Sequence, residues 1–100
     1  MSESSDSFVA ECFWTGVTER DVSDLDERIR AAVSAVAADG QPLRYAGSIL
    51  MPTDEVVLCL FEGSEDAVRL VAQRAAVPFE RIVPASSHQP LIMSAGGEAT

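Results

Sequence analysis

The sequence predicts one α+β domain with the element order β-α-β-β-α-β, and three observations support this fold class. The chain has 100 residues, the usual length of a single domain. Four short runs rich in β-branched and aromatic residues alternate with two longer segments in which apolar residues recur every three or four positions. Glycine, proline and aspartate separate these runs, as they do at turns and helix ends.

The first strand is predicted over residues 7–15 and the first helix over residues 18–38. Thr18 is placed to cap this helix, and Asp21 three residues later completes an approximate capping box. Gly40 follows as a helix stop, because glycine adopts the left-handed conformation at little cost. The helix carries one stripe of branched apolar residues, namely Val22, Leu25, Ile29, Val33 and Val36.

The second half repeats the pattern as strands over residues 43–51, 56–61 and 81–85, with a turn at 52–54 and a helix that begins at Ser64 and is broken at Val77-Pro78. Pro84 favours an edge position for the last strand. Right-handed crossovers place both helices on one face of a four-stranded antiparallel sheet, with the first and third strands central. This arrangement is the ferredoxin-like fold.

The strand pattern also predicts a homodimer. A sheet covered on one face should alternate apolar and polar residues, but the strand at 56–61 is apolar on both faces. The uncovered face would be an apolar patch on the order of several hundred Å², more than monomers usually expose. We expect a second copy packed sheet to sheet, as in a dimeric α+β barrel. The alternative is that residues 91–93 of the tail cover the face.

The domain is predicted over residues 7–88, between a disordered start at 1–6 and a C-terminal tail at 89–100. The net charge of −9, from 16 acidic and 7 basic residues, argues against nucleic acid and against anionic membranes as partners. No apolar run approaches the ~18–20 residues that cross a bilayer. The acidic start lacks the basic and apolar regions of a secretory signal, so a cytoplasmic protein is expected.

No strong catalytic motif is present, since the chain has no GxSxG, HExxH or glycine-rich phosphate loop. The candidates are single polar groups in or beside the sheet. Glu11 is predicted either to form an ion pair, with Arg44 or Arg81, or to be a site carboxylate with a raised pKa. Tyr45 either points into a cavity, where its phenol would bind a ligand or transfer a proton, or pairs with an aromatic residue across strands.

Two cysteines and one histidine are the remaining candidates. As a thiolate pair, Cys12 and Cys59 would bind a soft or borderline metal such as nickel, zinc or copper; otherwise they are small core residues. Ser48 is expected opposite Cys59 in the hairpin. His88 either contributes to a metal site, which one histidine cannot form alone, or lies in solvent after the last strand.

Several segments together resemble a family of small bacterial proteins of unknown function. They are Phe8-Val9, Gly16-Val17-Thr18, Leu43-Arg44-Tyr45, Ser48, Pro52, Leu58-Cys59-Leu60-Phe61-Glu62 and Val77 to Ile82. The resemblance covers about residues 7–84. That family includes a nickel-binding member with a dimeric ferredoxin-like fold, so the resemblance implies this fold, a homodimer and a site for nickel or another divalent metal. Tyr45, Ser48, Cys59 and Glu62 match the family pattern by position.

The leading hypothesis is a homodimeric binding protein, not an enzyme, that takes nickel, another divalent metal or a small molecule. A second hypothesis is a cofactor-free enzyme that acts on a hydrophobic small molecule in the cavity of a dimeric α+β barrel, with Tyr45 and Glu11 handling protons. A third is a purely structural interaction module, in which the dimer is the function.

Overall fold

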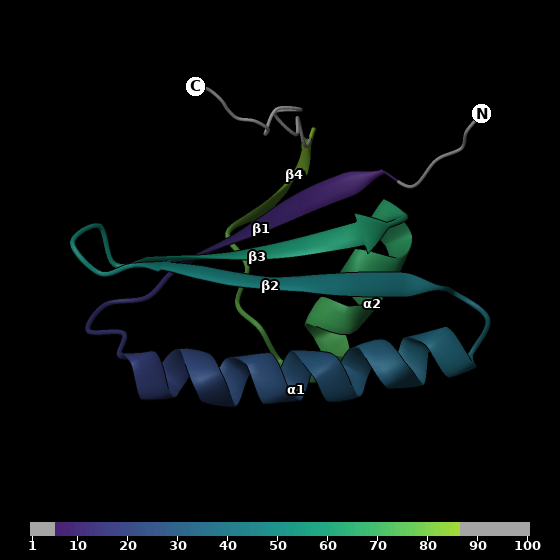
Figure 1. Cartoon of the computed structure of the whole chain (residues 1–100), viewed down its shortest axis with the longest axis horizontal. Helices are drawn as coiled ribbons and strands as arrows, with labels where there is room; N and C mark the ends of the chain where they lie inside the picture. The colour runs from purple at the N-terminus through teal and green to yellow at the C-terminus, as the bar shows by residue number, and fades with distance from the viewer. Residues whose placement is uncertain (1–5, 87–100) are drawn as a thin grey trace, which may run out of the picture.

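The computed structural model describes residues 6–86 (Figure 1). Its elements are β1 (Ser7–Phe13), α1 (Glu19–Ala38), β2 (Leu43–Met51), β3 (Val56–Gly63), α2 (Glu65–Ala75) and β4 (Arg81–Ala85). The predicted order is confirmed, and β1 ends two residues earlier than expected. The predicted tail and His88 lie outside the described residues. Within the described part of the chain, neither helix has the length and apolarity that a membrane span requires.

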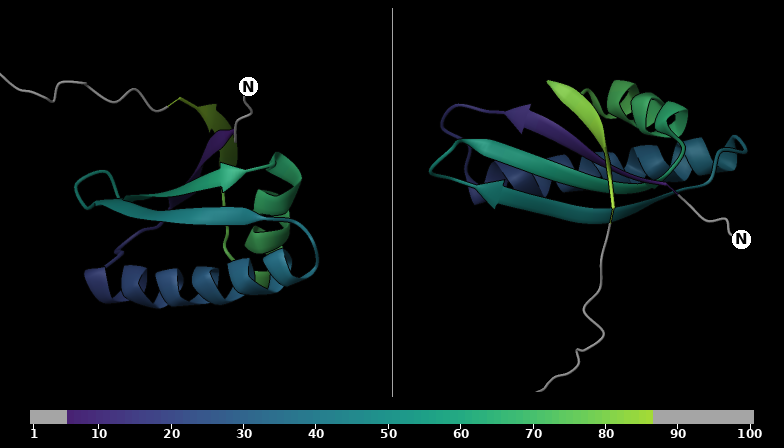
Figure 2. Two further views of the ribbon diagram at one scale, coloured as in Figure 1. Left: turned by 45° about the vertical axis from the view of Figure 1, so that its right-hand side comes forward. Right: turned by 90° about the horizontal axis from the view of Figure 1, so that it is seen from above.

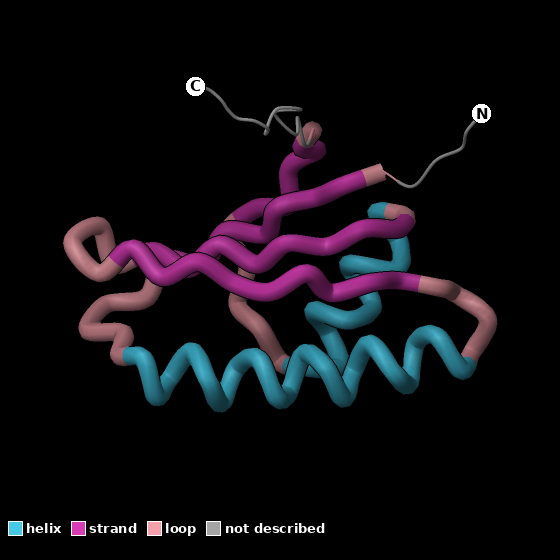
Figure 3. The backbone as a smooth tube through the Cα atoms, in the orientation of Figure 1, coloured by secondary structure: helices cyan, strands magenta, loops and turns pink. Residues whose placement is uncertain are grey.

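The four strands form one antiparallel sheet in the order β2-β3-β1-β4, so the predicted central strands are confirmed. Both helices lie on one side of this sheet, and no helix of residues 6–86 lies on the other side (Figures 2 and 3). The molecule therefore has two layers, as in the ferredoxin-like α+β fold predicted from the sequence. The two edges of the sheet are β2 and β4.

The helix ends follow the capping residues in the sequence. Thr18 accepts a hydrogen bond from the Asp21 amide at 3.1 Å, and the Asp21 carboxylate accepts one from the Thr18 amide at 2.9 Å. Ser64 caps α2 by accepting from the Ala67 amide at 3.1 Å. α2 ends before the predicted break at Val77-Pro78, because Ala76 already takes the left-handed conformation, with φ of 56°.

The core lies between the sheet and the helices. The inward strand positions alternate with outward ones, and those of β1 and β3 are buried almost completely: Phe8, Ala10, Cys12, Val57, Cys59 and Phe61. The helices supply the opposite wall through Val22, Leu25, Ile29, Ala32 and Val36 of α1 and Ala67, Val68, Val71 and Ala75 of α2. The apolar stripe predicted for the first helix is confirmed, with Ala32 buried more deeply than Val33.

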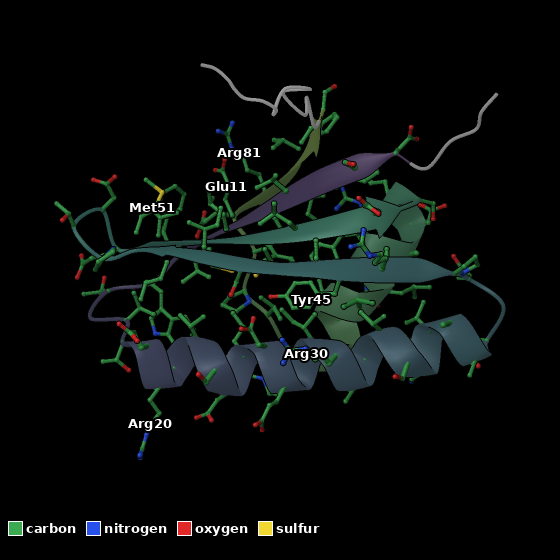
Figure 4. All side chains as sticks on the ribbon, viewed as in Figure 1. Glu11, Arg20, Arg30, Tyr45, Met51 and Arg81 are labelled. Atoms are coloured by element: carbon green, nitrogen blue, oxygen red, sulfur yellow. The ribbon has the colours of Figure 1, made fainter. Side chains whose placement is uncertain are left out.

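The side of the sheet that faces away from the helices is called the open face below. In Figure 4 the side chains of Glu11, Met51 and Arg81 lie on this side, whereas Tyr45 lies between the sheet and α1. The strand register gives the apolar residues of the open face, which include Val9, Phe13, Ile49, Met51, Val56, Leu58, Leu60 and Val83. Phe13 is 59% exposed, Ile49 49% and Met51 38%. The apolar second face inferred from the strand pattern is thus present, while the homodimer stays a prediction.

Candidate functional site

A polar cluster joins α1 to the edge strand β2. The half-buried Asp26 carboxylate accepts a hydrogen bond from the Tyr45 hydroxyl at 2.5 Å and another from the Ser48 hydroxyl at 3.2 Å. The Tyr45 ring packs against Phe61, with 5.1 Å between the ring centroids. Each carboxylate oxygen therefore has its own donor, and the aromatic contact fixes the phenol in place.

A β-bulge brings Tyr45 and Ser48 to the same side of the sheet. Residues three apart on a regular strand point to opposite faces, since side chains alternate. Here the register with β3 shifts between Tyr45 and Gly47, which pair with Phe61 and Leu60 in turn. The extra residue, Ala46, restores the helix-facing direction at Ser48. The cluster depends on this local irregularity of β2.

Asp26 is the member of the cluster that sequence reasoning missed. It follows Leu25, one of the most buried residues of α1, and lies four residues after Val22 and three before Ile29. Residues at these spacings share one side of a helix, so Asp26 borders the apolar stripe. That position was the available signal, because a carboxylate at the border of a buried face needs donors nearby.

A groove of about 400 Å³ runs beside the cluster, between α1 and β2. Val22, Leu50 and Pro52 form its apolar walls, and Glu19 and Ser23 lie on the α1 side. Ser48 belongs both to the groove lining and to the Asp26 cluster. The cluster therefore borders the groove through Ser48.

The environment of Tyr45 keeps its phenol protonated. Burial raises the pKa of Tyr45 above its ordinary value near 10, and the hydrogen bond to Asp26 raises that pKa further. At neutral pH Tyr45 is consequently a hydrogen-bond donor to Asp26 and does not act as a base.

The two predicted cysteines are core residues on the helix side of the sheet. Cys12 is 1% exposed, Cys59 is 0% exposed, and both are free thiols. Ser48 pairs with Cys59 in the sheet register, as expected from the hairpin. The hydrogen bond between the two thiols and burial both raise the pKa of Cys12. The same hydrogen bond lowers the pKa of Cys59, whereas burial acts in the opposite direction.

Two other predicted residues lie on the opposite side of the sheet. On the open face Glu11 accepts from Arg81 at 2.8 Å, and Glu62 forms an ion pair with Arg44 at 2.6 Å. Of the two arginines expected as partners of Glu11, Arg81 is the one that forms the ion pair. The sheet thus separates Glu11 and Glu62 from Cys12, Tyr45, Ser48 and Cys59.

The predicted residues do not converge on one metal centre. Among residues 6–86, no group of three or more histidine, cysteine, aspartate or glutamate side chains is placed to hold a metal ion. The buried thiols face the helices, and the Glu11 and Glu62 carboxylates are each bound to an arginine. His88, the remaining predicted ligand, lies outside the described residues.

Comparison with known proteins supports the fold. No family model matches the chain, and no curated protein matches its sequence. Among solved structures, the chain is similar to SCO4226 from Streptomyces coelicolor A3(2), with a TM-score of 0.63 and 22% sequence identity. The match covers 81% of this chain and 99% of that one. At this level of identity, the likeness shows a shared fold and nothing about function.

Proposed function

We propose that the chain is a small homodimeric binding protein whose ligand occupies the groove between α1 and β2. The observation that carries this proposal is the fixed cluster of Asp26, Tyr45 and Ser48 at the edge of that groove. Ligand sites are typically concavities of about 300–1,000 Å³ with mostly apolar walls and a few oriented polar groups. The groove, at about 400 Å³, is within that range.

The groups at the groove favour a ligand that donates hydrogen bonds. The Ser48 hydroxyl donates its hydrogen bond to Asp26, so the lone pairs of its oxygen remain available to accept from a ligand. Glu19 adds a carboxylate to the same lining. An amine, or a hydroxyl group on an apolar body, would match both the acceptors and the apolar walls at Leu50 and Pro52.

Nickel is the metal to test first, and the support for it is the family resemblance. The described residues supply no ready set of three ligands, as set out above. A nickel site would therefore need ligands from two copies, or from residues such as His88 together with one of the carboxylates. The acidic surface, with a net charge of −9, favours cations in general.

A cofactor-free enzyme is the second candidate, and the Tyr45–Asp26 hydrogen bond is the observation that favours it. The Asp26 carboxylate, oriented by the Tyr45 and Ser48 hydroxyls, could accept a proton from a substrate in the groove. The partner expected from the sequence was Glu11, but Glu11 lies across the sheet on the open face. In the enzyme hypothesis, Asp26 therefore replaces Glu11 as the carboxylate that handles protons.

The binding proposal is tested by closing the groove. Ser23→Trp places an indole at the groove lining, whereas Ser34→Trp places the same group on an exposed part of α1 outside the lining. Native mass spectrometry of untagged protein should show a dimer that retains a small molecule. The retained mass should be lost in Ser23→Trp and kept in Ser34→Trp.

Calorimetric titration with nickel chloride separates the metal from an organic ligand. Heat that disappears in Ser23→Trp would place nickel at the groove, and heat that persists would place it elsewhere. A protein that retains no small molecule and gives no heat with nickel would contradict the binding proposal. A monomer in the same mass spectra would contradict the dimer.

A further inference from the structure

The open face is electrically balanced, although the chain is strongly acidic. Its charged strand residues are two acids and two bases, joined as the pairs Glu11–Arg81 and Arg44–Glu62. The chain as a whole carries −9. Two copies that met through an acidic surface would repel each other, whereas this face brings no net charge into the contact. The balance therefore fits a second copy of the chain better than a strongly basic or acidic partner.

The open face also has an end with exposed apolar side chains and an end with a hollow. Phe13, Ile49 and Met51 are exposed near the β2–β3 hairpin, where Phe13 pairs with Val56 and Val56 with Met51. At the opposite end of the strands lies a hollow of about 280 Å³. Most of its lining residues lie on the open face, namely Ser7, Val9, Ala46, Leu60, Glu62 and Ala85, and the core residues Phe8 and Phe61 contribute to it as well.

We propose that two copies pack open face to open face about a two-fold axis perpendicular to the strands, so that the exposed Phe13 end of each copy fills the Ser7 end of the other. This inference rests on the homodimer of the proposed function and specifies its geometry. The axis lies in the plane between the two sheets. Because it is perpendicular to the strands, it places one end of each sheet over the opposite end of the other.

The other face-to-face arrangement packs poorly. With the axis parallel to the strands, the Phe13 side chains of both copies would meet, and the hollows of about 280 Å³ would face each other. Protein interfaces are packed as densely as interiors, and empty apolar volume lowers stability. The perpendicular axis brings an apolar projection over each hollow instead.

Cysteine cross-linking tests this geometry. Ser7 and Phe13 both lie on the open-face side of β1, six residues apart, which is about 20 Å along a strand. A short bifunctional maleimide spans the ~10 Å between two packed sheets but not the ~20 Å between these two positions of one chain. In the double variant Ser7→Cys/Phe13→Cys, this reagent should give a covalent dimer whose peptide map links position 7 to position 13. The buried native thiols Cys12 and Cys59 should remain free.

The matched controls are the single variants Ser7→Cys and Phe13→Cys, which should remain non-covalent dimers when treated with the same cross-linker. Efficient linkage of position 13 to position 13 in the single variant would overturn the perpendicular axis. A native dimer that links none of these positions would overturn the open face as the interface. In contrast, a monomer in native mass spectrometry would overturn the proposed function itself.

A spin-label measurement gives a second readout from one variant. Nitroxides on Phe13→Cys should be about 20 Å or more apart in the dimer, since the two labels lie at opposite ends. Labels within about 10 Å of each other, the spacing of two packed sheets, would show the parallel axis and contradict the proposal.

Discussion

At the scale of single residues, the phenol of Tyr45 links folding stability to pH. In the unfolded chain Tyr45 loses its proton near its ordinary pKa of about 10, whereas burial and Asp26 keep it protonated in the folded state. Above pH 10 the unfolded state therefore binds fewer protons than the folded state, and the free energy of unfolding falls as the pH rises. Below pH 10 this contribution is fully present.

We expect Tyr45→Phe to lower the free energy of unfolding by about 1–3 kcal/mol at neutral pH, because the Asp26 carboxylate loses a donor. Urea unfolding at several pH values measures both effects. Between about pH 9 and 11, the wild type should lose stability more steeply than Tyr45→Phe. Parallel curves for the two proteins would show that Tyr45 is not the titrating group.

The identity of single site residues was only partly predictable from the sequence. Ser48 was correctly expected opposite Cys59, because hairpin register follows from turn length. The partner of Glu11 was left open between two arginines, since both lie on strands next to the central pair. Asp26 was missed, because its contact with Tyr45 requires the packing distance between helix and sheet, which periodicity does not give.

At the scale of elements, the C-terminus of α2 offers a stabilising substitution. Ala76 has φ of 56° and ψ of 49°, a left-handed conformation that costs a residue with a Cβ about 1–2 kcal/mol. Ala76→Gly should raise the free energy of unfolding by about 0.5–1 kcal/mol, after the entropy that glycine loses on folding is subtracted. Chemical denaturation measures the change.

The control for this substitution is Ala31→Gly, at an exposed position inside α1. There glycine should lower stability by about 1 kcal/mol, because it weakens a regular helix. Equal effects of the two substitutions would mean that the left-handed conformation of Ala76 is not maintained in solution.

Element boundaries were predictable where side chains set them and less so elsewhere. The capping box at Thr18 and Asp21 can be recognised from the residue types alone, and it fixes the start of α1. The end of α2 was placed at Val77-Pro78, but a backbone conformation at Ala76, a residue with no turn preference, ends it earlier. The bulge in β2 was missed, although Gly47 was an available signal, because an isolated glycine inside a strand often marks a bulge.

At the scale of the whole molecule, the balanced charge of the open face bears on the proposed dimer. Arg81→Glu would place a second acid beside Glu11 and leave the face with a net charge of −2 in each copy. We expect the dimer to weaken by at least about tenfold, because like charges across an interface cost more than 1.4 kcal/mol. Sedimentation equilibrium at low salt measures the dissociation constant.

The exchanged pair Glu11→Arg/Arg81→Glu is the control, since it restores a neutral face with the ion pair reversed. It should dimerise more tightly than Arg81→Glu alone. Arg81→Glu with the dissociation constant of the wild type would show that the open face is not the contact surface.

The bulge in β2 has a consequence for how far assembly can proceed. Strands at the rim of a sheet can recruit further chains by backbone pairing, which leads to filaments without end. In this chain the shift at Ala46 interrupts the hydrogen-bonding ladder of β2, and Pro84 removes one amide donor from β4. Backbone-mediated growth is disfavoured at both rims, whereas contact between two faces uses up each face once. A dimer formed face to face, as proposed, would therefore stop at two copies and resist polymerisation.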